Sequence, residues 1–441
     1  MENNNKICVM GMGYVGLTLS VTLAEVGYNV LGVDINENTI KKLSEGHPHF
    51  FEKNLAVRLK HQVFNKKLSF VTKAPNEYYD VIIISVGTPL KEGSKVPNLS
   101  FMDQVIHDVT DIIKPGTLVC MRSTVPVGIT KTKVLPAIET KTDLRVGKDF
   151  FLAFTPERTI EGKALQELRE NSQIVGGITK ACTEKAANFF LHLTPTVVSV
   201  SSTEIAEFSK IIDNCYRDLK FSFSNEMALV SEHIGLDIHE VLNAANIHYP
   251  RNNIPVPSPG VGGACLSKDP HIFIDFAKKA GYHPKLISEA RRINESYPGI
   301  IVDRIENKYH GLGCNLNKST VLIAGFAFKG KPETADLRDS TTLLLLKEIQ
   351  SRSTCTVKGY DPIVNDSELG AMGIEPVVLP AGFQDVDILI IANNHESYSD
   401  WNIYELISKM NKPCIIYDGW RMLNKENFET FEKVLYLSPG L

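Results

Sequence analysis

The amino-acid sequence predicts an α/β protein in which two doubly wound domains are joined by a long central helix and a helical domain. Short apolar runs alternate with helical stretches up to about residue 195, and a similar series begins at residue 319. Between them lies a stretch with the pattern of one helix of about thirty residues. A chain of 441 residues is also too long for one ordinary core. We therefore predict domains over residues 1–200, 201–312 and 313–441.

Short apolar runs in the first and third domains have the length of buried parallel strands. Most end in Gly, Ser, Thr, Asp or Pro, which is typical of loops at the carboxyl edge of a sheet. In the first domain the runs cover residues 6–11, 29–34, 80–89, 117–124 and 149–157. In the third domain they cover residues 319–326, 355–362, 387–394 and 413–420.

The central helix is predicted over residues 203–234, a stretch without proline or glycine. Thr203 can cap its start and Gly235 can end it. At 1.5 Å per residue the helix would be roughly 45 Å long, so we expect it to join two lobes and to offer a dimer surface. Two further helices are expected at about 268–280 and 284–298. In the central helix, apolar residues recur at roughly helical spacing, namely Ile205, Phe208, Ile212, Leu219, Phe223 and Met227.

Composition excludes several function classes. A hydrophobic content of 43% and a net charge of −4 describe a globular protein without a basic footprint for nucleic acid. The polar start is unlike a secretory signal, and the longest apolar runs are too short to span a bilayer. The eight cysteines form no C-x-x-C pair, so neither a zinc site nor a disulfide scaffold is indicated. We expect a cytoplasmic enzyme with reduced thiols, no metal and no membrane partner.

The sequence "GMGYVG" places Gly11, Gly13 and Gly16 between a strand and a helix. Glycines in this context permit a tight turn and the close approach of a pyrophosphate to the helix N-terminus, as in Rossmann-like domains. Asp34 ends the next strand, where it can bind ribose hydroxyls and would repel a 2′-phosphate. No arginine follows it, so we predict NAD rather than NADP. The expected cofactor residues of this turn are Gly11, Gly13, Tyr14, Val15, Gly16 and Asp34.

Thr88 and Thr124 end later strands of the same sheet, on the edge where a nicotinamide would lie. They are candidate cofactor contacts, and the alternative is that they only stabilise turns. In the long helix, Lys210, Asn214 and Arg217 are spaced by four and three residues and therefore share one face. Such a pattern usually marks a solvated stripe, but this helix is mostly apolar, which favours a functional triplet.

"PGVGGACLSKDP", residues 259–270, presents a cysteine after a Gly-rich loop at a predicted helix start. Exposed backbone N–H groups, the helix dipole and the charge of Lys268 would all lower the pKa of the Cys265 thiol. These residues alone leave two interpretations open. Cys265 is either a small buried side chain or a nucleophile.

Several motifs together resemble the nucleotide-sugar 6-dehydrogenases, the family of UDP-glucose and UDP-N-acetylhexosamine dehydrogenases. They are G-x-G-x-x-G, "STVPVG", "PE" followed by "EG" at 156–162, K-x-x-x-N in the long helix, "GVGGACLSKD", "GFAFKG" and "YDGWR". The resemblance covers nearly the whole chain and favours the nucleophile. It implies an NAD domain, a helical middle with the dimer contact, and a C-terminal domain that binds UDP. The implied reaction oxidises the C6 alcohol of the sugar to a carboxylate with two NAD.

The resemblance also implies roles for single residues. Cys265 would trap the aldehyde as a thiohemiacetal and then form a thioester. Lys210 and Asn214 would stabilise oxyanions at C6, and Asp269 would activate water or relay a proton. Glu157 would act as general base with Thr124 and a water. The implied substrate contacts are Arg158, Glu161, Lys210, Asn214, Arg217, Arg251, Gly262, Lys329 and Arg421, with Arg251 entering the partner subunit's site.

The identity of the sugar stays open between two branches of the family. Arg158 and Arg217 resemble the N-acetylhexosamine branch, with mannosamine or glucosamine configuration, and we favour it. Ala264 and Lys268 resemble the glucose branch instead. A Glu-Pro-Gly-Leu segment common in the family appears here as "EKNL", residues 52–55.

Two other functions remain as alternatives. A two-electron dehydrogenase of the β-hydroxyacid type would not need Cys265, and such enzymes generally lack a second α/β domain. A nucleotide-sugar sensor without catalysis would not need Cys265, Lys210 and Asp269 together.

Overall fold

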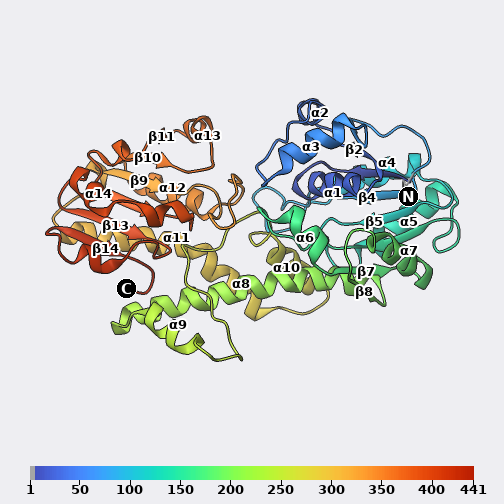
Figure 1. Ribbon diagram of the computed structural model, residues 1–441. Helices are drawn as coiled ribbons and strands as arrows, with labels where there is room; N and C mark the ends of the chain where they lie inside the picture. The colour runs from blue at the N-terminus through green and yellow to red at the C-terminus, as the bar shows by residue number, and fades with distance from the viewer. Residues whose placement is uncertain (1–4) are drawn as a thin grey trace. The chain divides into compact units, whose positions relative to one another are not determined.

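The computed structural model describes residues 5–441 and contains two α/β units, each built on a largely parallel sheet (Figure 1). Contacts within the chain define one compact unit from the described residues up to 213 together with 271–283. The other unit comprises residues 214–270 and 284–441. The predicted fold class, with two doubly wound domains and a long helix, is confirmed. The domain boundaries after residues 200 and 312 stay a prediction.

The sheet of the first unit has the strand order β3-β2-β1-β4-β5-β6-β7-β8. Its first six strands are parallel and follow the order of a dinucleotide-binding domain. Strand β7 runs antiparallel to β6. The strands are β1 Lys6–Met10, β2 Asn29–Val33, β3 Leu68–Val71, β4 Val81–Ile84, β5 Leu118–Met121, β6 Phe151–Phe154, β7 Gln173–Gly177 and β8 Val197–Val200.

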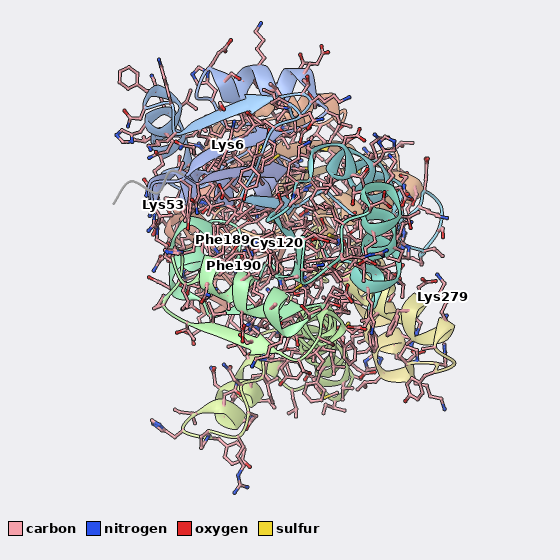
Figure 2. All side chains as sticks on the ribbon, turned by 90° about the vertical axis from the view of Figure 1, so that its right-hand side faces the viewer. Lys6, Lys53, Cys120, Phe189, Phe190 and Lys279 are labelled. Atoms are coloured by element: carbon pink, nitrogen blue, oxygen red, sulfur yellow. The ribbon has the colours of Figure 1, made fainter. Side chains whose placement is uncertain are left out.

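Alternate side chains of these strands face two separate apolar cores, because successive residues of a strand point to opposite faces. Helices α1, α3, α6 and α7 cover one face, and α4 and α5 cover the other. Figure 2 labels Cys120, Phe189 and Phe190, which belong to the first of these cores. The helices are α1 Tyr14–Glu25, α2 Glu37–Ser44, α3 Leu55–Phe64, α4 Ser100–Ile112, α5 Leu135–Thr142, α6 Ala164–Glu170 and α7 Lys180–Phe190.

The sheet of the second unit is wholly parallel, with the order β11-β10-β9-β12-β13-β14. It repeats the order of the first six strands of the other sheet. Helices α11 and α12 pack on one face, and α14 packs on the other. The strands are β9 Thr320–Ala324, β10 Thr356–Tyr360, β11 Glu375–Pro376, β12 Ile388–Ile391, β13 Cys414–Asp418 and β14 Val434–Leu437. The helices are α9 Ile238–Asn246, α11 Lys285–Gly311, α12 Thr341–Arg352, α13 Asp366–Ala371 and α14 Ile403–Lys409.

Two further helices, α8 (Thr203–Ile234) and α10 (Asp269–Lys279), each contribute residues to both units. The predicted long helix is α8, and Gly235 follows it with a φ of +71°. The predicted cap is displaced by one residue. Ser202, not Thr203, accepts the N–H of Ile205 through its side chain, and Thr203 is already helical.

One predicted helix end is wrong. The helix expected over 284–298 continues as α11 to Gly311, with Pro298 in its interior. Proline removes one backbone hydrogen bond, but Tyr297, Ile301 and Val302 around it are buried in the core of the second unit. Burial of this apolar face outweighs the lost bond. Five strands were not predicted, namely β3, β7, β8, β11 and β14.

Candidate active site

The Gly-rich turn between β1 and α1 has the geometry that a pyrophosphate needs. Gly11 has a φ of +95°, which favours glycine. A Cβ on Gly16 would lie 1.8 Å from the carbonyl oxygen of Gly11, so only glycine lets α1 pack this closely. A Cβ on Gly13 would meet no atom within 4 Å, so this side of the turn is open. The turn therefore fits a dinucleotide at the N-terminus of α1, beside Tyr14 and Val15.

Asp34 follows β2 and faces the same turn. Its Oδ2 accepts the backbone N–H of Met12 at 2.8 Å, and its Oδ1 accepts the N–H of Asn36 at 3.0 Å. These bonds hold the carboxylate beside the Gly-rich turn, where ribose hydroxyls would lie.

The structure brings Thr88 and Thr124 together. The Thr88 hydroxyl donates to the carbonyl of Thr124 at 2.6 Å, which joins the loops after β4 and β5. The second loop is also held by Glu207 of α8, a fully buried carboxylate. Glu207 accepts the N–H groups of Gly128 and Thr130 and the Thr130 hydroxyl, at 2.5, 2.9 and 2.6 Å. Glu207 therefore fixes the loop of Thr124 to the helix that bears Lys210.

Glu157, Arg158 and Glu161 lie on the loop that follows β6. The Glu157 carboxylate accepts the N–H of Thr159 at 2.5 Å, and Arg158 Nε lies 3.1 Å from an Asp213 oxygen. The predicted general base Glu157 and the predicted substrate contacts Arg158 and Glu161 are thus at the carboxyl edge of the first sheet.

The start of this loop is anchored by two buried side chains. Arg122 Nη1 donates to the carbonyl of Thr155 at 3.1 Å and to Gln173 Oε1 at 3.0 Å. Gln173 in turn donates to the carbonyl of Pro156 at 3.0 Å. The two carbonyls directly before Glu157 are therefore held in place.

Cys265, Lys268, Asp269 and Asn214 gather in the second unit. Cys265 is exposed and lies one turn before Asp269, whose N–H donates to its carbonyl at 2.9 Å. Asp269 is fully buried and accepts the Asn214 amide at 2.5 Å and the Lys268 ammonium at 2.7 Å. Burial would lower the pKa of Lys268, but Asp269 and Cys265 outweigh it and raise that pKa. An accessible thiol thus lies next to a persistent positive charge.

Lys210 lies one turn before Asn214 on α8 and is buried, 8% exposed. Arg217, the third member of the predicted triplet, is exposed. The triplet is therefore divided. Lys210 and Asn214 are on the buried face of the helix, whereas Arg217 is open to solvent.

The backbone of the Cys265 loop is fixed by Arg291 of α11 and by the loop before α12. Arg291 is buried and forms an ion pair with Asp218, with 2.7 Å between Nη1 and Oδ1. It also donates hydrogen bonds to the carbonyls of Val261 and Leu266, at 3.0 and 2.8 Å. The carbonyl of Asp339 accepts the N–H of Gly263 at 2.9 Å. A Cβ on Gly262 would lie 2.4 Å from this carbonyl, so Gly262 permits close packing here.

The three remaining basic residues are all in the second unit. Arg251 is exposed, with its guanidinium 5.9 Å from the centre of the Tyr249 ring. Lys329 Nζ lies 5.3 Å from the centre of the Phe328 ring. Arg421 forms an ion pair with Asp237 at 2.8 Å and donates a hydrogen bond to the Ser438 hydroxyl, so its guanidinium contacts other residues of the protein. Its predicted contact with substrate stays a prediction.

Sequence reasoning missed the residues that hold these loops, namely Arg122, Gln173, Glu207 and Arg291. Only Glu207 carried a signal, because it shares a helix face with Lys210 and Asn214. The others act through backbone groups far away in the sequence, which no local pattern reveals.

Comparison with known proteins decides the family. Three models of the UDP-glucose/GDP-mannose dehydrogenase family match in succession, the NAD binding domain at residues 5–194, the central domain at 204–296 and the UDP binding domain at 322–425. The chain belongs to this dehydrogenase family. The resemblance predicted from the motifs is therefore confirmed, and membership makes the chain an NAD-dependent UDP-sugar dehydrogenase.

Similar family members include several proteins from archaea. A UDP-N-acetyl-D-mannosamine dehydrogenase of Pyrococcus horikoshii is 34% identical over 427 residues, which cover 95% of this chain and 96% of the relative. A solved UDP-D-ManNAc dehydrogenase structure from the same organism has a TM-score of 0.89 at 30% identity, with 99% of both chains covered. A UDP-glucose dehydrogenase structure from Pyrobaculum islandicum has a TM-score of 0.84 at 26% identity, covering 99% of this chain and 98% of that one.

Residues 5–441 contain neither a metal-binding cluster nor a membrane-spanning helix. No three His, Cys, Asp or Glu side chains there gather in a way that could hold a metal ion. Within the same range, no helix combines the length and apolar character that crossing a membrane requires.

Proposed function

We propose that this dehydrogenase oxidises the C6 hydroxyl of a UDP-N-acetylhexosamine to the carboxylate of a UDP-uronic acid. The overall reaction converts one primary alcohol, one water and two NAD into one carboxylate, two NADH and three protons. The cluster of Cys265, Lys268, Asp269 and Asn214 supports this proposal most directly. It supplies the nucleophile that a four-electron oxidation needs between its two steps.

Cys265 has the properties of an attacking thiolate. It is exposed, and it lies beside the positive charge of Lys268, whose pKa Asp269 and Cys265 raise against the effect of burial. Buried thiols are poor nucleophiles by comparison, since burial raises the pKa of Cys120, for example, to about 12. We infer that the Cys265 sulfur attacks the aldehyde carbon to give a thiohemiacetal, and that a second oxidation converts this to a thioester.

Bound NAD would accept the hydride of each oxidation, and the open side of the turn at Gly13 fits its pyrophosphate. Lys210 and Asn214 donate hydrogen bonds to the oxygen at C6 whenever it bears negative charge. Asp269 holds the Asn214 amide in position and directs water to the thioester, whose hydrolysis releases the carboxylate and the free thiol. Glu157, with Thr124 and a water, takes the proton of the C6 hydroxyl.

The favoured sugar has the mannosamine or glucosamine configuration. Arg158 and Arg217 resemble the N-acetylhexosamine branch, and the Pyrococcus relative is a UDP-N-acetyl-D-mannosamine dehydrogenase. Both side chains are exposed. The remaining proposed substrate contacts are Glu161, Arg251, Gly262, Lys329 and Arg421. UDP-glucose is the alternative substrate, supported by Ala264 and Lys268 and by the Pyrobaculum structure.

A second copy of the chain is the proposed partner of α8. The face of this helix that packs into the protein holds the polar side chains of Glu207, Asn214 and Asp218, while several large apolar side chains of the helix are exposed. Spacings of four and seven residues align the exposed side chains in one stripe. The stripe consists of Ile212, Tyr216, Phe223, Val230 and Ile234. A homodimer would bury this stripe and place Arg251 near the partner's site.

The decisive experiment counts NADH per sugar consumed. Purified protein is incubated with excess NAD and, separately, UDP-N-acetylmannosamine, UDP-N-acetylglucosamine, UDP-glucose and UDP-galactose. Two NADH and a uronate from an N-acetyl sugar are expected. Two NADH from UDP-glucose alone would keep the reaction but overturn the branch. One NADH with every substrate would refute the role of Cys265 and favour a two-electron dehydrogenase, and binding without turnover would favour a sensor.

A further inference from the structure

Glu52 has a buried carboxylate in the segment 52–55, which leads into α3. Its side chain is 5% exposed, whereas its neighbour Lys53 is exposed at the surface (Figure 2). Asn54 follows with a φ of 65° and leads into α3. Asparagine tolerates this left-handed conformation better than most residues. The turn thereby keeps Glu52 directed into the protein.

The Glu52 carboxylate accepts hydrogen bonds from two distant segments. The Tyr14 hydroxyl, at the start of α1, donates to its Oε2. The backbone N–H of Gly162 also donates to Oε2, at 2.6 Å, and that of Ala164 donates to Oε1 at 3.0 Å. The N–H of Gly162 lies 3.1 Å from the Tyr14 hydroxyl as well. One carboxylate therefore joins the cofactor turn to the end of the loop after β6.

This loop is the segment that bears Glu157, Arg158 and Glu161. Its start is held independently by Arg122 and Gln173, so Glu52 is the contact that fixes its far end. Burial, together with the hydrogen bond to Glu52, raises the pKa of Tyr14, and its hydroxyl therefore remains a donor. A change in the position of Tyr14 on cofactor binding would reach the loop through Glu52.

We propose that Glu52 is a positioning residue that fixes the sugar-side loop and couples its order to the cofactor turn. The proposal rests on the proposed function, which assigns Glu157, Arg158 and Glu161 to the sugar side. In physical terms, NAD bound at the turn restricts Tyr14, and the shared carboxylate transmits that restriction to Gly162 and Ala164. NAD and the UDP-sugar then bind with positive coupling.

The test compares Glu52→Gln with Glu25→Gln. Glutamine keeps the shape of Glu52 but presents an NH₂ group to a backbone N–H, so one anchoring bond is lost. Glu25 is a matched control because it pairs with Arg169 of α6, 2.9 Å away, and with Arg58 of α3, without touching the loop. We expect kcat/KM for the UDP-sugar to fall about tenfold to a hundredfold in Glu52→Gln only. The dissociation constant for NAD alone should match that of the control.

Hydrogen exchange of residues 157–164 provides a second readout that needs no turnover. In the wild type, NAD should slow exchange of this segment, and Glu52→Gln should abolish the effect. Equal kinetic losses in both variants, or unchanged NAD protection in Glu52→Gln, would overturn the proposal. If Glu52→Gln does not fold, Tyr14→Phe tests the same link, since it leaves both backbone bonds to Glu52 intact. Retained NAD protection in Tyr14→Phe would then refute the coupling. A wild type that fails to release two NADH refutes the proposed function instead, independently of the exchange result.

Discussion

Replacement of Arg291 by methionine should destabilise the second unit and displace the Cys265 loop. Arg291 is 2% exposed and forms a buried ion pair with Asp218 as well as bonds to the carbonyls of Val261 and Leu266. Methionine fills much of the same volume but leaves the Asp218 charge without its cation. Removal of one partner of a buried ion pair costs about 3–5 kcal/mol, which corresponds to a fall in Tm of about 6–20 °C for a unit of this size.

The assay is thermal unfolding followed by circular dichroism, with Arg292→Met as the matched control. Arg292 is the next residue of α11, but its side chain is 70% exposed and pairs with Glu289 at the surface. Such a pair contributes about 0–1 kcal/mol, so this control should lower Tm by only about 0–4 °C. The rate of Cys265 alkylation, read by mass spectrometry, should change in Arg291→Met only. Equal Tm values and equal alkylation rates in the two variants would refute the reasoning.

Three other predictions follow from single residues. Cys265→Ser should abolish uronate formation while NAD still binds in calorimetry, and normal uronate yield would contradict the covalent step. Gly16→Ala should lower the free energy of unfolding by about 3 kcal/mol, because its Cβ would lie 1.8 Å from the Gly11 carbonyl oxygen. Gly13→Ala should fold normally and only weaken NAD binding, because its Cβ would meet no atom within 4 Å. Urea unfolding and NAD titration of both variants test these two expectations. Asp237→Asn should lower the free energy of unfolding by about 1–2 kcal/mol at pH 7. Burial would raise the pKa of Asp237, but Arg421 and Lys425 outweigh this effect and lower that pKa to about 2. Since the folded pKa is depressed, this stability is present above about pH 4 and is lost as pH falls toward 2, so unfolding curves of the two proteins should converge there.

The sequence predicted the strands and glycines of the cofactor turn because their signals are local. Most predicted strands have a core of consecutive apolar residues, and Gly11, Gly13 and Gly16 have fixed spacing within one turn. β7 and β14 were missed because neither stands out as a long apolar run, and β7 contains two glycines. The end of α11 was missed because Pro298 is a strong local stop signal that tertiary packing overrides.

The candidate site divides in the same way. Cys265, Asp269, Lys210 and Asn214 lie within short motifs, and the sequence could indicate them. Arg291 and Glu52 bond to backbone groups that are 25 residues or more away along the chain. A side chain that holds a carbonyl or an N–H has no partner residue type, so neither composition nor periodicity can point to it.

The exposed apolar stripe of α8 has a thermodynamic consequence. Because α8 leaves its apolar stripe exposed, an isolated protomer presents this apolar surface to water. If a second copy covers the stripe, part of the folding free energy becomes an association free energy and follows mass action. The melting temperature should then fall as the protein is diluted, and a charged residue at Phe223 should make it independent of concentration.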